Sequence, residues 1–463
     1  MSSRYAIILA AGKGTRMKSK LYKVLHKVSG KAMVEHVLTQ VAQTMPSEII
    51  TIIGHGAEAV KAQLGERSSY VLQEEQLGTG HAVLQARALL DGKHGETLVI
   101  SGDTPLLTAQ TLKDLFEHHA RSHASVTVLT AQADDPAGYG RIIRNHSGAL
   151  ERIVEQKDAT AKEAKIQEIN TGVYVFNNKL LFSALSELNT NNAQGEYYLT
   201  DIIEILKNSE HTVAAFQMSA FEESLGVNDR LALAKANCLM RKRINQFHMM
   251  NGVTLLDPAS TYIEADVEIG SDTIIEGNVS LKGQTKIGSD VFIGSGSEIV
   301  DSILEDNTKV IRSVIENSIL HEGADTGPFA HLRPKSELGK NAHVGNFVEI
   351  KASTLGEGVK AGHLTYVGDA KIGRKVNLGA GVIFVNYDGK NKFKSQIEDY
   401  AFIGSNSDIV APIYIGKNAV VAAGSTVNQD VPEDALALGR ARQVVKEGYA
   451  QRYNHYHKND DDE

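Results

Sequence analysis

A glycine-rich loop near the N-terminus has the composition of a phosphate-binding site. Residues 9–17 are Leu-Ala-Ala-Gly-Lys-Gly-Thr-Arg-Met, and a lysine follows at position 23. The glycines allow backbone N–H groups to turn toward an anion, while Arg16 and Lys23 supply positive charge for a triphosphate and a pyrophosphate leaving group. Met17 occupies the place of the last glycine of a dinucleotide fingerprint, and the Walker A pattern is also absent. The loop therefore favours phosphate chemistry other than that of kinases or dinucleotide-dependent oxidoreductases, with a simple turn as the alternative.

Two later segments carry groups that suit a metal ion and a base. Asp103 directly follows a buried apolar run, where a carboxylate often binds Mg²⁺; the alternative is an acidic helix cap. Residues 73–80, Gln-Glu-Glu-Gln-Leu-Gly-Thr-Gly, combine amides with tight backbone, which suits the edge of a base; the alternative is a plain surface turn. Together with the first loop, these segments favour a site for a nucleotide and a divalent cation.

A second polar cluster interrupts an otherwise monotonous C-terminal repeat. Arg333 and Lys351 precede His363 by 30 and 12 residues. Cations gathered on a net-acidic chain favour an anionic ligand such as a sugar phosphate. An unperturbed histidine titrates near pH 6.5, so His363 could accept a proton near neutrality; the alternative is a structural or solvated histidine. The other members of the cluster are Tyr366, Asn377, Asn386 and Tyr387.

The N-terminal half must position the first group of residues. Apolar runs predict strands over 5–10, 48–53, 97–100 and 125–130, and a helical pattern covers 32–43. This alternation predicts a parallel sheet with helices on both faces. Ligands of such sheets bind beyond the carboxyl ends of the strands. The loops Gly12–Arg16 and Gly102–Pro105 should therefore lie there together.

A six-residue period identifies the architecture of the C-terminal half. Aliphatic residues recur at Ile263, Ile269, Ile275, Leu281, Ile287, Ile293 and Ile299. One short strand and one turn per six residues builds a parallel β-helix, in which each aliphatic stacks on its equivalent one coil, or about 18 residues, away. The polar segment 386–395 should be a loop that leaves the coil, and residues 457–463 form a charged tail.

A helical stretch over residues 230–250 separates the two halves. Leu233, Met240, Ile244 and Phe247 fall near one of its faces. About 20 residues of helix span about 30 Å, enough to join two domains. The predicted domains are a catalytic domain over 1–229, a helical linker over 230–250 and a β-helix domain with its tail over 251–463.

The composition excludes several classes of function. The 463 residues carry 48 Lys and Arg against 56 Asp and Glu, a net charge of −8 that offers no basic excess for nucleic acid. No apolar run reaches the ~18 residues of a membrane span. Cys238 is the single cysteine, which excludes a disulfide within the chain and a cysteine-based zinc cluster. We expect a cytoplasmic protein with small-molecule substrates.

Taken in order, the motifs resemble those of a bacterial enzyme family that combines N-acetylglucosamine-1-phosphate uridylyltransferase with glucosamine-1-phosphate acetyltransferase activity. The resemblance covers about residues 3–445 and extends to Tyr139-Gly140-Arg141, Asn170-Thr171-Gly172 and Gly226-Val227-Asn228-Asp229. It implies an α/β fold class, with a Rossmann-like nucleotidyltransferase domain followed by a left-handed parallel β-helix of hexapeptide repeats. It also implies a homotrimer that makes UDP-N-acetylglucosamine for peptidoglycan and other cell-envelope polymers.

For the first domain, the resemblance implies residues that bind UTP and UDP-N-acetylglucosamine. The sugar phosphate oxygen would attack the α-phosphorus of UTP and release pyrophosphate, so the protein would mainly position and neutralise. The residues implied are Leu9, Ala10, Ala11 and Gly12 for the nucleotide, Gln73, Gly78 and Thr79 for uracil, Arg16 and Lys23 for the phosphates, and Gly140, Glu155 and Asn170 for the sugar. Asp103 and Asn228 would hold Mg²⁺.

For the second domain, the resemblance implies that His363 takes a proton from the amine of glucosamine 1-phosphate, which then attacks the thioester of acetyl-CoA. Arg333 and Lys351 would bind the sugar phosphate, with Tyr366 and Asn377 on the sugar. The residues implied for acetyl-CoA are Ala380, Asn386, Tyr387, Ser405, Ala423 and Arg440.

Three positions depart from the pattern of this family. Tyr22 and Ala32 stand where many relatives have proline, and Phe384 is bulkier than the residue expected there. No functional group is lost, so the departures concern loop stiffness and local packing.

Three interpretations of the whole chain remain open on the sequence. The chain is a bifunctional enzyme, a uridylyltransferase whose β-helix serves only assembly or regulation, or a non-enzymatic solenoid that binds ligands. The polar cluster around His363 discriminates between the first two, and the third leaves Asp103 and the glycine-rich loop unexplained.

Overall fold

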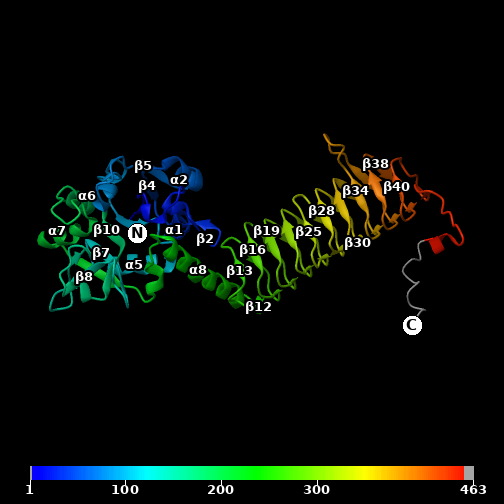
Figure 1. Cartoon of the computed structure of the whole chain (residues 1–463). Helices are drawn as coiled ribbons and strands as arrows, with labels where there is room; N and C mark the ends of the chain where they lie inside the picture. Colours follow the sequence, from blue (N-terminus) through cyan, green and yellow to red (C-terminus); the bar gives the residue numbers. More distant parts are fainter. Residues whose placement is uncertain (1–2, 453–463) are drawn as a thin grey trace. The chain divides into compact units, whose positions relative to one another are not determined.

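A computed structural model describes residues 3–452 of the chain. The described backbone forms two compact units that divide between Gln246 and Phe247 (Figure 1). The division into a catalytic domain that ends at residue 229, a linker and a domain that begins at residue 251 stays a prediction. The predicted charged tail lies outside the described residues.

The first unit is built on one central sheet. Its strand order is β11-β7-β10-β6-β1-β4-β5, and the hairpin β8–β9 attaches to β10. The strands are β1 (Arg4–Ala10), β4 (Glu48–Ile53), β5 (Ser69–Leu72), β6 (Glu96–Ser101), β7 (Val126–Gln132), β8 (Gly140–Arg144), β9 (Leu150–Val154), β10 (Glu168–Asn177) and β11 (Val213–Gln217). The four predicted strands are present within two residues of their expected ends.

The sheet is mixed rather than parallel throughout, because β9 and β10 run against the other strands. β1, β4, β5 and β6 are parallel, but β10 runs antiparallel to both β6 and β7. β10 enters the sheet after the β8–β9 hairpin and is buried along most of its length. An apolar run buried on both faces carries no mark of strand direction, so direction follows from the chain path.

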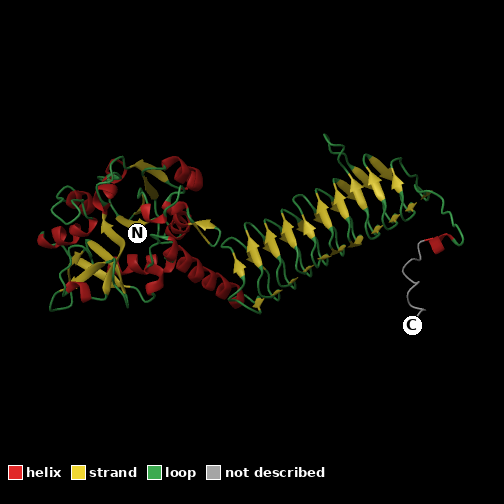
Figure 2. Cartoon of the chain, in the orientation of Figure 1, coloured by secondary structure: helices red, strands yellow, loops and turns green. Residues whose placement is uncertain are grey.

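Helices cover both faces of the sheet, as predicted (Figure 2). Alternate residues of β1 point to opposite faces, so Ala6 and Ile8 belong to one core cluster and Tyr5 and Ile7 to the other. The first cluster includes side chains of α1 (Met33–Ala42) and α5 (Ala109–Arg121). The second includes side chains of α3 (Thr79–Leu84), α6 (Asn178–Leu185) and α7 (Ile202–Asn208). The other short strands and α-helices of this unit are β2 (Lys27–Val28), β3 (Lys31–Ala32), α2 (Ala57–Leu64) and α4 (Arg87–Leu90).

The predicted linker is the helix α8 (Arg230–Met250). The Asp229 carboxylate accepts a hydrogen bond from the backbone N–H of Ala232 at 2.8 Å and caps the helix. Ala236 and Met240 are buried in a cluster with residues of the first unit, and Leu233 and Ile244 pack against it. Phe247, which the sequence analysis grouped with these residues, is 61% exposed, and the apolar cluster ends at Ile244.

The second unit is a left-handed parallel β-helix, as predicted. Its short strands run from β12 (Thr254–Leu255) to β41 (Leu436–Ala437) and form three sheets of eleven, ten and nine strands. In nearly every case a strand pairs with the strand three places later, so the residues that the period of six aligned lie in register one coil apart, for example Ile263 with Leu281. Figure 1 shows the stacked coils. The predicted loop leaves the coil between β34 (Ile383–Val385) and β35 (Ser395–Ile397).

Across residues 3–452, no helix is both long enough and apolar enough to cross a membrane.

Candidate active sites

A pocket of about 300 Å³ lies at the carboxyl ends of β1 and β6, where the sequence predicts a ligand. Nine predicted residues line it: Leu9, Ala10, Ala11, Gly12, Lys23, Gln73, Gly78, Thr79 and Asp103. Arg16 is exposed and is not among the lining residues. Gln76, from the segment expected to contact a base, also lines the pocket, as do Ser101 and Glu196, to which the sequence analysis assigned no role.

Backbone contacts fix the two loops that form this pocket. The N–H of Gly102 donates to the carbonyl of Leu9 at 2.9 Å, which joins the ends of β1 and β6. The Gln76 amide donates to the carbonyl of Ala11 at 2.6 Å, which ties the segment expected to contact the base to the phosphate loop. Gly78 has φ +116°, and an added Cβ would lie 2.6 Å from the carbonyl oxygen of Tyr197, so only glycine fits there.

Lys23, Asp103 and Asn228 meet at one side of the pocket although they are far apart in the sequence. The Lys23 ammonium contacts the Asp103 carboxylate and donates to Asn228 Oδ1 at 3.1 Å. The backbone N–H of Val227 donates to the Asp103 carbonyl at 2.9 Å, which holds the Asn228 segment in place. One carboxylate and one amide oxygen are suitable ligands for a hard cation such as Mg²⁺.

Such a cation would not be fully enclosed by protein. Residues 3–452 contain no group of three or more His, Cys, Asp or Glu side chains that could hold a metal ion. Mg²⁺ commonly uses one or two carboxylates and takes its other ligands from substrate phosphates and water. The donor set of Asp103 and Asn228 fits that mode of binding.

The three residues predicted for the sugar also come together. Gly140 on β8 pairs with Asn170 on β10, and an added Cβ at Gly140 would lie 3.5 Å from the Glu155 carboxylate. Gly140 therefore leaves space between the two polar side chains. Burial raises the pKa of the Glu155 carboxyl. Glu155 also lines a neighbouring cavity of about 530 Å³ with Asp201.

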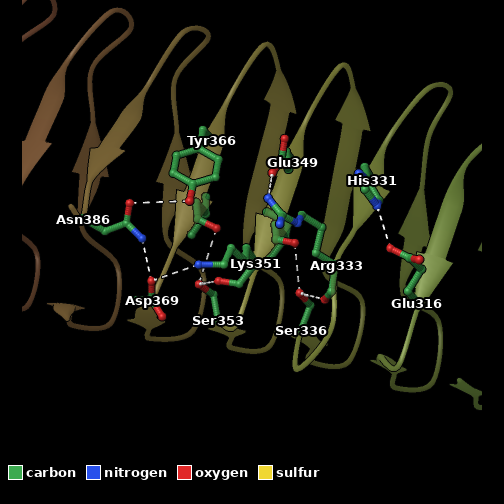
Figure 3. Close-up of polar contacts among 12 residues, drawn as sticks. Glu316, His331, Arg333, Ser336, Glu349, Lys351, Ser353, Tyr366, Asp369 and Asn386 are labelled. Atoms are coloured by element: carbon green, nitrogen blue, oxygen red, sulfur yellow. Dashed lines mark hydrogen bonds and ion pairs between the residues drawn. The ribbon is translucent and has the colours of Figure 1, made fainter. Parts of the chain in front are cut away.

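In the β-helix, four predicted residues lie on one sheet (Figure 3). Arg333 follows β25 (His331–Leu332), Lys351 ends β28 (Glu349–Lys351), Tyr366 begins β31 (Tyr366–Gly368) and Asn386 follows β34. These strands are successive neighbours in the ten-stranded sheet. Four residues that are 15 to 20 positions apart in the sequence are thus brought onto neighbouring strands.

Acidic side chains hold this group in place. Arg333 donates to Glu349 at 2.8 Å, and this hydrogen bond raises the pKa of the Arg333 guanidinium. Asp369 lies 3.5 Å from the Lys351 ammonium and accepts from the Asn386 amide at 2.6 Å. The sequence analysis assigned no role to either acid, because each pairing depends on which residues stack in neighbouring coils.

Gly368 makes room for two of these side chains. It lies in register with Lys351, but an added Cβ would collide with the Tyr366 hydroxyl and lie 2.6 Å from the Asn386 amide nitrogen. The Tyr366 hydroxyl donates to Asn386 Oδ1 at 3.5 Å across this gap. The absence of a side chain at Gly368 thus lets Tyr366 and Asn386 fill the space beside the column that carries Arg333 and Lys351.

The extended loop supplies a further cation. The backbone of Lys392 forms an isolated antiparallel β-bridge with Tyr387 in the loop, and the Lys392 amine lies beside Lys351. A hydrogen bond and charge repulsion from Lys351 lower the pKa of the Lys392 amine. Nothing in the period of six indicates where a loop folds back, so the sequence analysis missed this residue. Tyr387 is exposed, and its hydroxyl donates to the Gly389 carbonyl at 2.6 Å.

The remaining predicted residues lie on a different sheet of the β-helix. His363 ends β30 (Lys360–His363), and Asn377 begins β33 (Asn377–Leu378), with β36 (Phe402–Ile403) and β39 (Val420–Val421) next in the same sheet. If the registers of these strands are continued past the strand ends, four predicted residues fall into one column, each one coil from the next: His363, Ala380, Ser405 and Ala423. Arg440 is exposed, and its side chain lies 3.9 Å from where a Cβ of Gly424 would be.

Two departures from the family pattern preserve the backbone conformation. Tyr22 has φ −61° and ψ 143°, and Ala32 has φ −59° and ψ 143°, close to the values that proline imposes. The third departure, Phe384, is fully buried in the β-helix.

Comparison with known proteins matches both units. The model of the nucleotidyl transferase family matches residues 5–236, and that of the bacterial transferase hexapeptide repeat matches residues 266–301 and 394–429. The chain is 64% identical to the bifunctional protein GlmU of Enterococcus faecalis, over 98% of this chain and 99% of that protein. It is 60% identical to that of Latilactobacillus sakei, over 97% of each chain, and 57% identical to that of Streptococcus thermophilus, over 98% and 99%.

Proposed function

The chain belongs to the family of the bifunctional protein GlmU, which combines uridylyltransferase and acetyltransferase activities, and we propose that each unit carries one of the two reactions. The β-helix transfers an acetyl group from acetyl-CoA to glucosamine 1-phosphate. The first unit then transfers uridylyl from UTP to N-acetylglucosamine 1-phosphate and releases pyrophosphate. The observation that carries the proposal is that each unit has its own group of polar residues in contact: Lys23, Asp103 and Asn228 in the first, and Lys351, Asp369 and Asn386 in the second.

In the first unit, the chain's own groups position the substrates of uridylyl transfer. The phosphate loop and Lys23 hold the triphosphate, Gln73 and Thr79 hold uracil, and Glu155 with Asn170 holds the sugar. Mg²⁺ on Asp103 and Asn228, when bound, neutralises charge on the phosphates. An oxygen of the sugar phosphate attacks the α-phosphorus, and the bond to pyrophosphate breaks. Alignment and charge neutralisation supply the catalysis, because no side-chain nucleophile is needed.

In the β-helix, His363 acts as the base for acetyl transfer. It takes a proton from the attacking amine of glucosamine 1-phosphate as the nitrogen bonds to the thioester carbon. The C–S bond then breaks, and coenzyme A leaves as a thiol after receiving a proton. Arg333, Lys351 and Lys392 hold the sugar phosphate, because cations on neighbouring coils and on the adjoining loop suit a dianion.

The other predicted contacts extend away from this base. Tyr366 and Asn377 hold the sugar. Acetyl-CoA lies along the column that runs from His363 toward the C-terminal coils and against the extended loop. Its contacts are Ala380, Asn386, Tyr387, Ser405, Ala423 and Arg440.

The acetyltransferase acts as a homotrimer. Its support is an apolar ridge, formed by Phe329, Phe347 and Leu364 at equivalent corners of three successive coils. They are 49%, 56% and 61% exposed, and the two phenyl rings stack with centroids 5.4 Å apart. Each has φ between +51° and +59°, a conformation that disfavours bulky residues, so large apolar side chains at such corners indicate a covered surface. In a trimer, the other two copies of the chain would cover this ridge. The trimer would work in the cytoplasm.

Subunit mixing tests whether acetyl-transfer sites are shared between copies. The predicted ligands run over several coils, about 4.8 Å apart each, which is far for one sugar on one chain. Mixing His363→Ala with Arg440→Ala protein and allowing subunit exchange should restore some acetyl transfer. If demonstrably mixed trimers stay inactive, each site is built within one chain.

Supplying different substrates tests whether both reactions are carried out by this protein. The protein should convert glucosamine 1-phosphate, acetyl-CoA, UTP and Mg²⁺ into UDP-N-acetylglucosamine. Without acetyl-CoA, no product should form from glucosamine 1-phosphate, whereas N-acetylglucosamine 1-phosphate should still be converted. If only N-acetylglucosamine 1-phosphate is converted, and glucosamine 1-phosphate is not converted even with acetyl-CoA, the β-helix is only a scaffold.

A further inference from the structure

Two strands of the β-helix are longer than the rest, and they meet at His363. Within residues 3–452, the strands of this unit have two or three residues, except for β27 (His343–Asn346) and β30 (Lys360–His363), which have four. The two are neighbours, and Asn346 is the register partner of His363. The extra length therefore brings one particular pair of side chains into line.

Glycines allow this extension. Gly345 and Gly362 precede the paired residues, and an added Cβ at Gly345 would collide with the carbonyl oxygen of Gly362. Hydrogen bonds then fix the backbone beyond: the Leu364 N–H donates to the Asn346 carbonyl at 3.1 Å, and the Thr365 hydroxyl donates to the His363 carbonyl at 2.8 Å. The main chain of the pair is thus held, while the exposed imidazole depends on a side-chain partner for its orientation.

That partner is the Asn346 amide. Asn346 Oδ1 lies 2.5 Å from His363 Nδ1. A carbonyl oxygen only accepts, so Nδ1 carries the proton and donates it. In a neutral imidazole this tautomer leaves the lone pair on Nε2. In the part of the chain that the structure describes, no other side chain hydrogen-bonds this ring.

The choice of an amide stands out against the other histidines of the described coils. His343 pairs with Asp325 at 2.7 Å, and His331 pairs with Glu316 at 3.0 Å. His321 lies between two carboxylates, and its hydrogen bonds to them raise the pKa of its ring. A carboxylate favours the protonated imidazole, which cannot act as a base, whereas an amide orients the ring without adding charge.

We propose that Asn346 is a positioning residue for acetyl transfer, which fixes the Nδ1–H tautomer of His363 and directs Nε2 at the substrate amine. This inference rests on the proposed role of His363 as the base. Asn346 acts through the imidazole and does not touch the acetyl group.

Two substitutions separate positioning from folding. Asn346→Ala removes the acceptor and should lower kcat for acetyl transfer by about 10- to 100-fold, with little change in KM, as for other groups that orient a functional imidazole. Asn346→Asp retains an acceptor and adds charge, so it should restore part of kcat while moving the acid limb of the pH–rate profile to higher pH by about one unit. Uridylyl transfer by the same proteins should be unchanged.

A matched control and a double variant complete the test. Asp325→Asn alters a histidine pair one coil earlier on the same sheet and should leave acetyl transfer unchanged. Adding Asn346→Ala to His363→Ala should cause no further loss. Full acetyl transfer in His363→Ala would overturn the proposed base itself. Loss in His363→Ala, with normal kcat in Asn346→Ala and an unmoved acid limb in Asn346→Asp, would overturn only the role of Asn346.

Discussion

The two units assemble their candidate sites over very different distances along the chain. In the first unit, Lys23 meets Asn228, 205 residues later, because the sheet brings the ends of several strands to one edge. In the β-helix, His363 meets Asn346 only 17 residues away, and Lys351 meets Asp369 at a similar separation. A site in a solenoid therefore grows by stacking neighbouring coils, whereas a site in a doubly wound sheet needs the whole topology.

Buried and paired histidines show the same contrast in the electrostatics of the two units. In the first unit, His119 is buried under the sheet and hydrogen-bonds the Thr127 hydroxyl at 2.9 Å; burial lowers its pKa to about 4. In the β-helix, His321 lies half-buried between Glu305 and Glu337, which raise its pKa. Enclosure determines the first case, and the charges of adjacent coils determine the second.

The largest expected effect separates the two activities. Asp103→Ala should reduce uridylyl transfer by about 100- to 10,000-fold, because the metal loses its carboxylate, and leave acetyl transfer intact. His363→Ala should do the reverse by removing the base. Assays of each half-reaction on folded protein measure this, with His343→Ala as a histidine control on the same sheet. Loss of both activities from either change would contradict the assignment of one site to each unit.

Substitutions that create a cavity in the core should show how far a local loss of stability spreads within each unit. Leu112→Ala and Leu320→Ala remove fully buried leucines of the first and second unit, at a cost of about 2–5 kcal/mol each. The first should lower the unfolding temperature of its whole unit. The second should loosen mainly adjacent coils, because each coil contacts only its neighbours. Hydrogen exchange followed along the chain compares the two; equally widespread loss of protection in both would remove the distinction.

The end point of a fragment should decide how much of α8 the first unit needs. A fragment of residues 1–229 lacks Ala236 and Met240, which are buried against that unit, so it should be less stable than residues 1–246 by about 2–4 kcal/mol. Denaturant unfolding measures the difference. Both fragments should convert N-acetylglucosamine 1-phosphate and UTP when folded. Equal stability would mean that the helix contributes nothing to the first unit.

The smallest effect is an opposite response to mild acid. His119 has a folded pKa of about 4 against 6.5 when unfolded, so the first unit loses stability as the pH falls from 6.5 toward 4. His321 has a raised pKa, so its contribution is complete below pH 6.5 and is lost as the pH rises through the folded value. Hydrogen exchange at pH 5.5 and 7.5 compares the units, with His119→Gln and His321→Gln as controls. A variant that keeps the wild-type pH response of its unit would refute the role of that histidine.

The sequence by itself determined the β-helix and the presence of both candidate sites. The six-residue period aligned Ile263 with Leu281, set the loop at residues 386–395 and put the predicted residues of each coil near one another, because repeated local geometry needs no long-range information. The glycine-rich loop and Asp103 indicated a phosphate and metal site, because their chemistry is carried by residue type and by position after a strand.

Only the tertiary structure decided the partners and the direction of β10. Lys392 and Asn346 carried no local signal, since an amide or an amine in a loop or strand has many possible neighbours until the chain folds. Arg16 fits a phosphate loop by type, yet it lies outside the set of residues that line the pocket. The direction of β10 depends on how the β8–β9 hairpin enters the sheet. Residue chemistry and short periods are local properties of a chain, whereas pairing and direction depend on contacts that form only when distant segments pack together.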